Sequence, residues 1–237
     1  MEKKYKRLLL KLSGEYLGGE KGEGFDFEVI NGLTKQICDI HDQGYEVSIV
    51  LGGGNFFRGT KSIPINIDRV AADHIGMMAT MMNGVCLKEA LVCAGKKATV
   101  MTGLEAPAVA AFFNKAEAVS LISNNHILIF SGGTGNPYFS TDTAAVLRAL
   151  EIEADVVIKG TKVDGVYDKD PVKDPSAIKY DSLTYDLILA KDLKVMDGSA
   201  IALCRDNSLP LCVLSIAKQT DLLDFLNGKQ VGTLATG

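Results

Sequence analysis

Residues 7–14, Arg-Leu-Leu-Leu-Lys-Leu-Ser-Gly, contain a short apolar run that stops at a serine and a glycine. A run of this length, bounded by turn-forming residues, predicts a buried β-strand over residues 7–12. Segments 45–51, 126–130 and 155–159 have the same form, and each leads into a turn rich in glycine or hydroxyl-bearing residues. These four runs predict a sheet whose strands end alike.

Helical segments separate the strands. Residues 26–43 carry apolar side chains at helical spacing, and Gly44 follows where a C-terminal cap belongs. Further helices are predicted over residues 69–94, 107–123 (broken near Asn114), 141–152, 183–191, 198–206 and 220–226, and further strands over 97–101, 211–214 and 231–234. Strands alternating with helices indicate an α/β fold, in which helices cover both faces of a mostly parallel central sheet.

The chain has no internal repeat and no clear linker, so residues 1–237 are interpreted as a single domain. Two stretches depart from the alternation. Residues 18–24 are rich in glycine and are expected to form a mobile loop. Residues 164–176 are rich in Asp, Lys and Pro and are expected to form an excursion over a site.

The composition is typical of a soluble protein that does not bind nucleic acid. Lys and Arg number 25 and Asp and Glu 29, so the net charge is −4, whereas proteins that bind nucleic-acid backbones are usually basic. We judge no apolar run long enough to cross a bilayer. The five cysteines lack disulfide or metal-ligand spacing, and the three histidines are dispersed. We therefore expect a cytoplasmic protein with no metal site of its own and no membrane partner.

Four strand ends carry turns suited to anions. Lys11 precedes a serine and a glycine, three glycines at 52–54 precede Arg58, a Ser-Gly-Gly-Thr-Gly-Asn-Pro turn occupies 131–137, and Lys159 precedes a glycine and a threonine. Glycines let backbone N–H groups approach an anion closely, and Lys or Arg neutralises its charge. Each feature alone is more often an ordinary turn or a solvated rim charge. Their recurrence at one edge of a parallel sheet favours a site for two phosphate-rich ligands.

The fingerprints of the commonest nucleotide-binding folds are absent from the sequence. There is no Gly-x-x-x-x-Gly-Lys-Ser/Thr phosphate loop, no Gly-x-Gly-x-x-Gly after a strand, and no protein-kinase His-Arg-Asp or Asp-Phe-Gly set. A redox or dinucleotide-binding α/β protein is thereby disfavoured.

Three of these segments resemble the amino acid kinase superfamily: Lys-Leu-Ser-Gly at 11–14, Gly-Gly-Gly-Asn with Arg-Gly at 52–59, and Lys-Gly-Thr-Lys-Val-Asp-Gly-Val-Tyr at 159–167. Residues 134–142, Thr-Gly-Asn-Pro-Tyr-Phe-Ser-Thr-Asp, look like the acceptor segment of its bacterial uridylate kinase (UMP kinase) branch, as do 73–77 and 195–197. The resemblance covers nearly the whole chain, and residues 134–139 are its most specific part. Acetylglutamate, glutamate and aspartate kinases share the glycine turns but not this segment.

The resemblance implies a three-layer α/β/α sandwich and the reversible reaction ATP + UMP → ADP + UDP of pyrimidine nucleotide biosynthesis, with Mg²⁺ carried by ATP. It also implies a homohexamer built as a trimer of dimers, activated by GTP and inhibited by UTP. The implied catalytic residues are Lys11, which neutralises the transferring phosphoryl group, Arg58 between the two phosphates, and Asp142, which orients Lys11. The implied ATP-binding residues are Lys11, Leu12, Ser13, Gly14, Gly54, Arg58, Lys159, Thr161, Tyr167 and Asp170. The implied UMP-binding residues are Gly53, Asp73, Thr134, Gly135, Asn136, Pro137, Tyr138, Phe139, Ser140 and Thr141.

Two alternatives lie within the same superfamily. One is a kinase that phosphorylates a carboxylate or carbamate, which residues 134–142 argue against. The other is a non-catalytic nucleotide-binding or storage protein, which the presence of Lys11, Arg58 and Asp142 together argues against.

Overall fold

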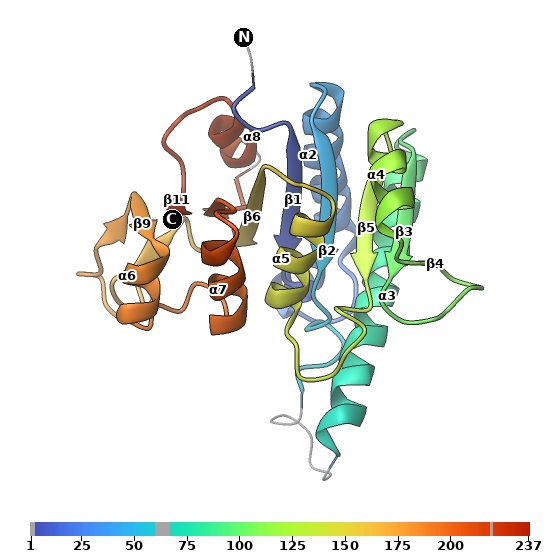
Figure 1. The fold of residues 1–237 in the computed structure, drawn as a ribbon, viewed down its shortest axis with the longest axis horizontal. Helices are drawn as coiled ribbons and strands as arrows, with labels where there is room; N and C mark the ends of the chain where they lie inside the picture. The colour runs from blue at the N-terminus through green and yellow to red at the C-terminus, as the bar shows by residue number, and fades with distance from the viewer. Residues whose placement is uncertain (1–2, 60–66, 219) are drawn as a thin grey trace.

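The predicted strands form one central sheet in the computed structural model, which describes residues 3–59, 67–218 and 220–237 (Figure 1). The sheet has nine strands in the order β4-β3-β5-β2-β1-β6-β10-β11-β9. Its neighbours are parallel except for the antiparallel pair β10 and β11. The strands are β1 (Arg7–Leu12), β2 (Glu46–Leu51), β3 (Ala98–Thr102), β4 (Ala111–Phe112), β5 (Ile127–Ser131), β6 (Val156–Thr161), β9 (Ser182–Thr184), β10 (Leu211–Ser215) and β11 (Thr233–Thr236). A separate antiparallel hairpin pairs β7 (Val166–Tyr167) with β8 (Lys179–Tyr180).

Helices cover both faces of this sheet, so the predicted three-layer α/β/α fold is confirmed. Apolar side chains of α2 (Phe27–Asp42), α3 (Arg69–Cys93) and α8 (Asp221–Leu226) share one core cluster. Those of α4 (Lys115–Ser123), α5 (Thr141–Glu151), α6 (Tyr185–Ala190) and α7 (Gly198–Asp206) share the other. In Figure 1, α5 and α7 cross in front of the sheet while α2 lies behind it. The short helix α1 (Gly14–Leu17) and the 3₁₀ turn η1 (Gly19–Lys21) follow β1.

The pleat of β1 determines where its lysine lies. Leu8, Leu10 and Leu12 belong to the α2–α3 core, whereas Leu9 belongs to the α5 core. Because side chains alternate along a strand, Lys11 lies on the same face as Leu9, toward α5. The parallel register then pairs it directly with a second lysine, Lys159 of β6.

Some predicted elements differ from the structure. The helix predicted over 183–191 begins at Tyr185, after β9, and the strand predicted over 231–234 is shifted to Thr233–Thr236. The helix predicted over 107–123 begins only at Lys115, where the Asn114 side chain caps it by accepting from the Glu117 N–H at 3.0 Å. The preceding residues form β4, since Ala111 and Phe112 pair with β3. Residues 18–24, predicted as a mobile loop, contain η1 and are anchored: the Gly24 N–H donates to the Asn55 carbonyl at 3.0 Å.

Helix α3 corrects the estimate that no apolar run could cross a bilayer. By length and composition this 25-residue helix passes as a candidate span: an 18-residue window within it has a mean hydropathy of 1.2, and 44% of that window is buried within the fold. Core helices of soluble proteins pass the same test. The rest of its apolar character lies on the surface, where Met78 and Met82 are 52% and 46% exposed.

Candidate active site

Two cavities lie at the carboxyl ends of the central strands, as the strand-end turns predict. One of about 300 Å³ opens beyond β1 and β2 and is lined by Lys11, Ser13, Gly53 and Gly54 together with residues of α3 and the start of α5. The other, of about 400 Å³, lies beyond β6 and includes Lys159, Thr161 and Tyr167 in its lining. We call them the glycine-turn cavity and the β6 cavity.

A charged triad joins the two cavities. Asp142, in the first turn of α5, contacts Lys11 Nζ at 2.5 Å with one carboxylate oxygen and Lys159 Nζ at 2.8 Å with the other. All three side chains are largely buried, with exposed fractions of 11% for Lys11, 15% for Asp142 and 18% for Lys159. Lys159 also donates to the Val195 carbonyl at 2.6 Å. One carboxylate therefore compensates two ammonium groups, and the triad keeps a net positive charge beside both cavities.

Burial and charge act in opposite directions on this triad. Burial disfavours the ionised Asp142 carboxylate, but Lys11 and Lys159 outweigh it, and the pKa of Asp142 is lowered. Burial lowers the pKa of Lys159, and the charge of Lys11 adds to that effect, so the attraction of Asp142 only partly restores it. The arrangement favours an additional anion, because phosphate oxygens would relieve the excess positive charge.

The glycine turn at 52–54 packs so closely on α3 that side chains are excluded. A Cβ on Gly53 would lie 2.7 Å from the Gly76 carbonyl oxygen and 2.8 Å from Ala79 Cβ. A Cβ on Gly14 would meet the Gly52 carbonyl oxygen at 2.4 Å. Glycine is thus required here by close packing within the protein, which is a different reason from the predicted approach to an anion.

Arg58 lies beside this turn, held by neighbouring groups. Its Nε donates to the Gly54 carbonyl and its Nη2 to the Gly22 carbonyl, each at 3.2 Å. Glu15 contacts the guanidinium at 3.6 Å, and the Arg58 side chain is 46% exposed. Of the described residues, those lining the glycine-turn cavity do not include Arg58. In this arrangement it fastens residues 18–24 to the turn.

The predicted acceptor segment follows β5 and leads into α5. Phe139, Ser140 and Thr141 line the glycine-turn cavity, as does Asp73 of α3. Asp73 accepts from the Tyr138 N–H at 2.7 Å and pairs with Arg69 at 2.8 Å. Burial opposes ionisation of Asp73, but these contacts outweigh it and lower its pKa.

The first half of that segment forms a turn that packs against Gly103. Thr134 Oγ1 accepts from the Asn136 N–H at 3.1 Å. Gly135 has φ +81° and approaches Gly103 so closely that a Cβ would lie 2.3 Å from its carbonyl oxygen. Among the described residues lining the glycine-turn cavity, only Phe139, Ser140 and Thr141 come from the predicted UMP segment, so the structure does not bring residues 134–138 into that lining.

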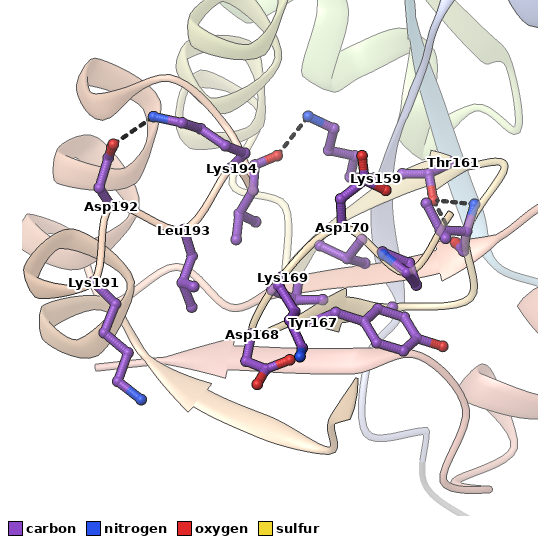
Figure 2. A pocket seen from close by; sticks show the side chains of 16 residues that line it. Lys159, Thr161, Tyr167, Asp168, Lys169, Asp170, Lys191, Asp192, Leu193 and Lys194 are labelled. Atoms are coloured by element: carbon purple, nitrogen blue, oxygen red, sulfur yellow. Dashed lines mark hydrogen bonds and ion pairs between the residues drawn. The ribbon is translucent and has the colours of Figure 1, made fainter. Parts of the chain in front are cut away.

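The β6 cavity contains the residues predicted for the adenosine part of ATP. Thr161, Tyr167 and Asp170 line it, and Figure 2 shows residues 191–194 on the side opposite Thr161 and Tyr167. The Tyr167 hydroxyl donates to Asp164 at 2.7 Å, which fixes the ring. This hydrogen bond raises the pKa of Tyr167. The predicted excursion at 164–176 therefore supplies a cavity wall.

Some cavity residues belong to none of the quoted motifs: Thr80 lines the glycine-turn cavity, and Lys191 and Lys194 line the β6 cavity. Only the fold brings them in. Gly76, Met77, Gly133 and Val195 also line the cavities; they lie within segments that the sequence singled out, but they were not predicted as site residues. In contrast, the predicted Leu12 is fully buried at 0% exposure and serves the core.

Known proteins resemble this chain over nearly its whole length. The sequence model of the amino acid kinase family matches residues 6–215. A uridylate kinase of Bacteroides thetaiotaomicron is 47% identical over 231 residues, which cover 98% of this chain and 98% of that protein. The crystal structure of a UMP kinase from Bacillus anthracis superposes with a TM-score of 0.95 at 38% identity, covering 98% of this chain and 96% of that one. The UMP kinase of Ureaplasma parvum gives a TM-score of 0.92, also at 38% identity, with both chains covered completely.

Proposed function

The chain belongs to the amino acid kinase family, and we propose that it is a nucleoside monophosphate kinase that transfers the γ-phosphoryl group of ATP to UMP, giving ADP and UDP. The observation that carries this proposal is the Lys11–Asp142–Lys159 triad, which lies between two cavities of nucleotide size. A phosphotransferase needs a donor and an acceptor held on either side of a positively charged point. The uridylate kinase relatives of nearly the same length support UMP as the acceptor.

The chemistry requires little from the protein beyond position and charge. Phosphoryl transfer passes through a state in which negative charge is spread over the phosphoryl oxygens, so cations and N–H donors stabilise it. We assign that role to Lys11 and to the backbone N–H groups of Gly53 and Gly54, with Lys159 on the ATP side. Asp142 holds both lysines in place and touches neither substrate. For Arg58 we propose a contact with the phosphates that would require it to leave Glu15 and the carbonyls of Gly22 and Gly54.

Mg²⁺ enters this scheme as part of the MgATP substrate. Asp142 is already engaged by two lysines, and within residues 3–59, 67–218 and 220–237 no group of three His, Cys, Asp or Glu side chains is arranged to hold a metal ion. The ion would neutralise the phosphate oxygens that bind it, and we assign it no protein ligand.

The substrates are tested by an ADP-release assay with MgATP, offering UMP, CMP, TMP, N-acetylglutamate, glutamate and aspartate separately. Turnover with UMP alone is expected. Turnover with an amino acid would keep the fold and discard residues 134–142 as a UMP-binding segment. No turnover with any acceptor would favour a non-catalytic nucleotide-binding protein.

Self-association through α3 is part of the proposal. An apolar hollow is lined by Phe25, Met78, Met81, Met82, Val85, Cys86 and Val109. Exposed apolar patches of this kind mark association surfaces, and a second copy of α3 has the matching character. We propose this face as one contact within a homohexamer. Light scattering of the Met82→Glu variant should show a smaller particle than the wild type, and an unchanged mass would argue against this face.

The proposal also covers regulation and cellular location. GTP as activator and UTP as inhibitor are predictions from the family resemblance, and each is tested by adding it to the UMP assay. A cytoplasmic location is supported by the five cysteines, all of which are free thiols.

A further inference from the structure

Two buried asparagine side chains hold each other face to face beneath the glycine turn. Asn55 follows the turn and is 4% exposed, and Asn83 lies inside α3 with 0% exposure. Asn55 Nδ2 donates to Asn83 Oδ1 at 2.9 Å, and Asn83 Nδ2 donates to Asn55 Oδ1 at 2.8 Å. The two amides therefore form a reciprocal pair within the protein interior.

The second N–H of each amide binds a backbone carbonyl. Asn83 donates to the Gly52 oxygen at 2.7 Å, and Asn55 donates to the Gly24 oxygen at 2.7 Å. Because both outer partners are acceptors, each side chain must present its NH₂ group there, so both amide orientations are fixed. The loss of one amide would leave several buried groups unpaired.

This pair lies where three parts of the candidate site meet. It holds the first residue of the 52–54 turn, whose next two glycines line the glycine-turn cavity. It holds Gly24, the end of the 18–24 segment. It also contacts the start of α1, since a Cβ on Gly14 would lie 2.6 Å from Asn55 Oδ1.

We infer that Asn83 is a positioning residue for phosphate binding. It fixes the Gly52 carbonyl and, through Asn55, the 18–24 segment, and so sets the direction of the Gly53 and Gly54 N–H groups. It lines neither nucleotide cavity. The inference rests on the proposed function, because it takes the turn to hold substrate phosphate. A positioning role predicts that replacing Asn83 weakens substrate binding even under conditions in which the variant is fully folded.

The test compares Asn83→Asp with a matched control. Asn83→Asp keeps the shape but replaces the NH₂ group, which supplies both N–H donors, with one oxygen that faces the Gly52 carbonyl and Asn55 Oδ1. Thr34→Val, on α2, removes a buried hydrogen bond to the Ile30 carbonyl (2.8 Å) away from the turn. The midpoint of thermal unfolding is measured first, and kcat and KM for UMP and for ATP are then measured where all proteins are fully folded.

We expect Asn83→Asp to raise the KM for UMP and lower kcat/KM by at least about tenfold, as for the loss of a well-placed hydrogen-bond donor. Thr34→Val, which loses a single buried hydrogen bond, should keep kcat and KM within about twofold of wild type. Equal kinetic losses in both variants, or unchanged kinetics in Asn83→Asp, would overturn the inference. If Asn83→Asp does not fold, Asn83→Ser is judged by the same criterion. If the wild type turns over no acceptor, the proposed function fails, and calorimetric ATP affinity then decides on Asn83 by the same tenfold criterion.

Discussion

Replacing Asp142 by Asn should expose how much the triad depends on one carboxylate. The amide keeps the shape, but it offers one neutral oxygen where two charged ones contacted Lys11 at 2.5 Å and Lys159 at 2.8 Å. The two lysines are register neighbours on adjacent strands, so their charges would then repel each other without compensation. Both ammonium groups would stay buried.

The size of the effect follows from burial. Removing one partner of a buried ion pair costs about 3–5 kcal/mol, because a charge is left uncompensated. For a chain of this length, about 2–4 °C of melting temperature corresponds to each kcal/mol, so we expect a fall of about 6–20 °C. The control is Glu153→Gln. Glu153 pairs with Lys115 at 3.1 Å, and the side chains of Glu153 and Lys115 are 68% and 56% exposed. Exposed pairs contribute about 0–1 kcal/mol, so this variant should unfold near the wild-type temperature.

The assay is thermal unfolding with and without a non-hydrolysable ATP analogue. Phosphate oxygens would replace the missing carboxylate beside Lys11 and Lys159, so the analogue should raise the melting temperature of Asp142→Asn more than that of the wild type. The reasoning is refuted if Asp142→Asn unfolds with the Glu153→Gln control, or if the analogue stabilises both proteins equally.

Three further perturbations test neighbouring parts of the argument. Lys11→Ala should lose most turnover, with kcat falling by about 10²-fold or more, while calorimetry still detects UMP binding; near-normal turnover would remove Lys11 from its role. Gly53→Ala should raise KM for UMP, because its Cβ would lie 2.7 Å from the Gly76 oxygen and must displace the turn; unchanged kinetics would contradict this packing. The pKa of Asp142 is lowered by folding, so its stabilisation is present above about pH 4, the ordinary range for Asp, and is lost as pH falls through the lower folded value. The gap in melting temperature between wild type and Asp142→Asn should therefore narrow below about pH 4, and a gap constant down to pH 2 would disprove the coupling.

Local patterns predicted most of the fold. The strand over Arg7–Leu12 and the helix over Gly198–Asp206 were predicted with the same bounds, since apolar runs and helical periodicity report burial directly. The helix predicted at 107–123 was wrong in its first half. There, pairing of Ala111 and Phe112 with an existing sheet edge outweighs local preference, and no single-sequence pattern reveals which edge is free.

The site was predictable only where chemistry leaves a mark on the sequence. Lys11 and Lys159 stood out because each precedes a small-residue turn at a strand end. Asn83 could not be predicted, because an asparagine within an apolar helix has no distinguishing sequence pattern, and its contact with Asn55 exists only in the folded protein. Residues that position a site, unlike those that form it, are recognised only by their contacts with residues distant in sequence.

The triad also predicts that stability and ligand binding are linked in this fold. Parallel register forces Lys11 and Lys159 side by side, and burial makes that arrangement unfavourable unless negative charge is supplied. Asp142 supplies part of it from the first turn of α5, where the helix dipole also favours a carboxylate. One negative charge against two positive ones leaves the site stable enough to fold and still short of an anion. A second carboxylate here would stabilise the empty protein but would compete with phosphate, so the incomplete compensation is what allows an ordered site to bind a nucleotide.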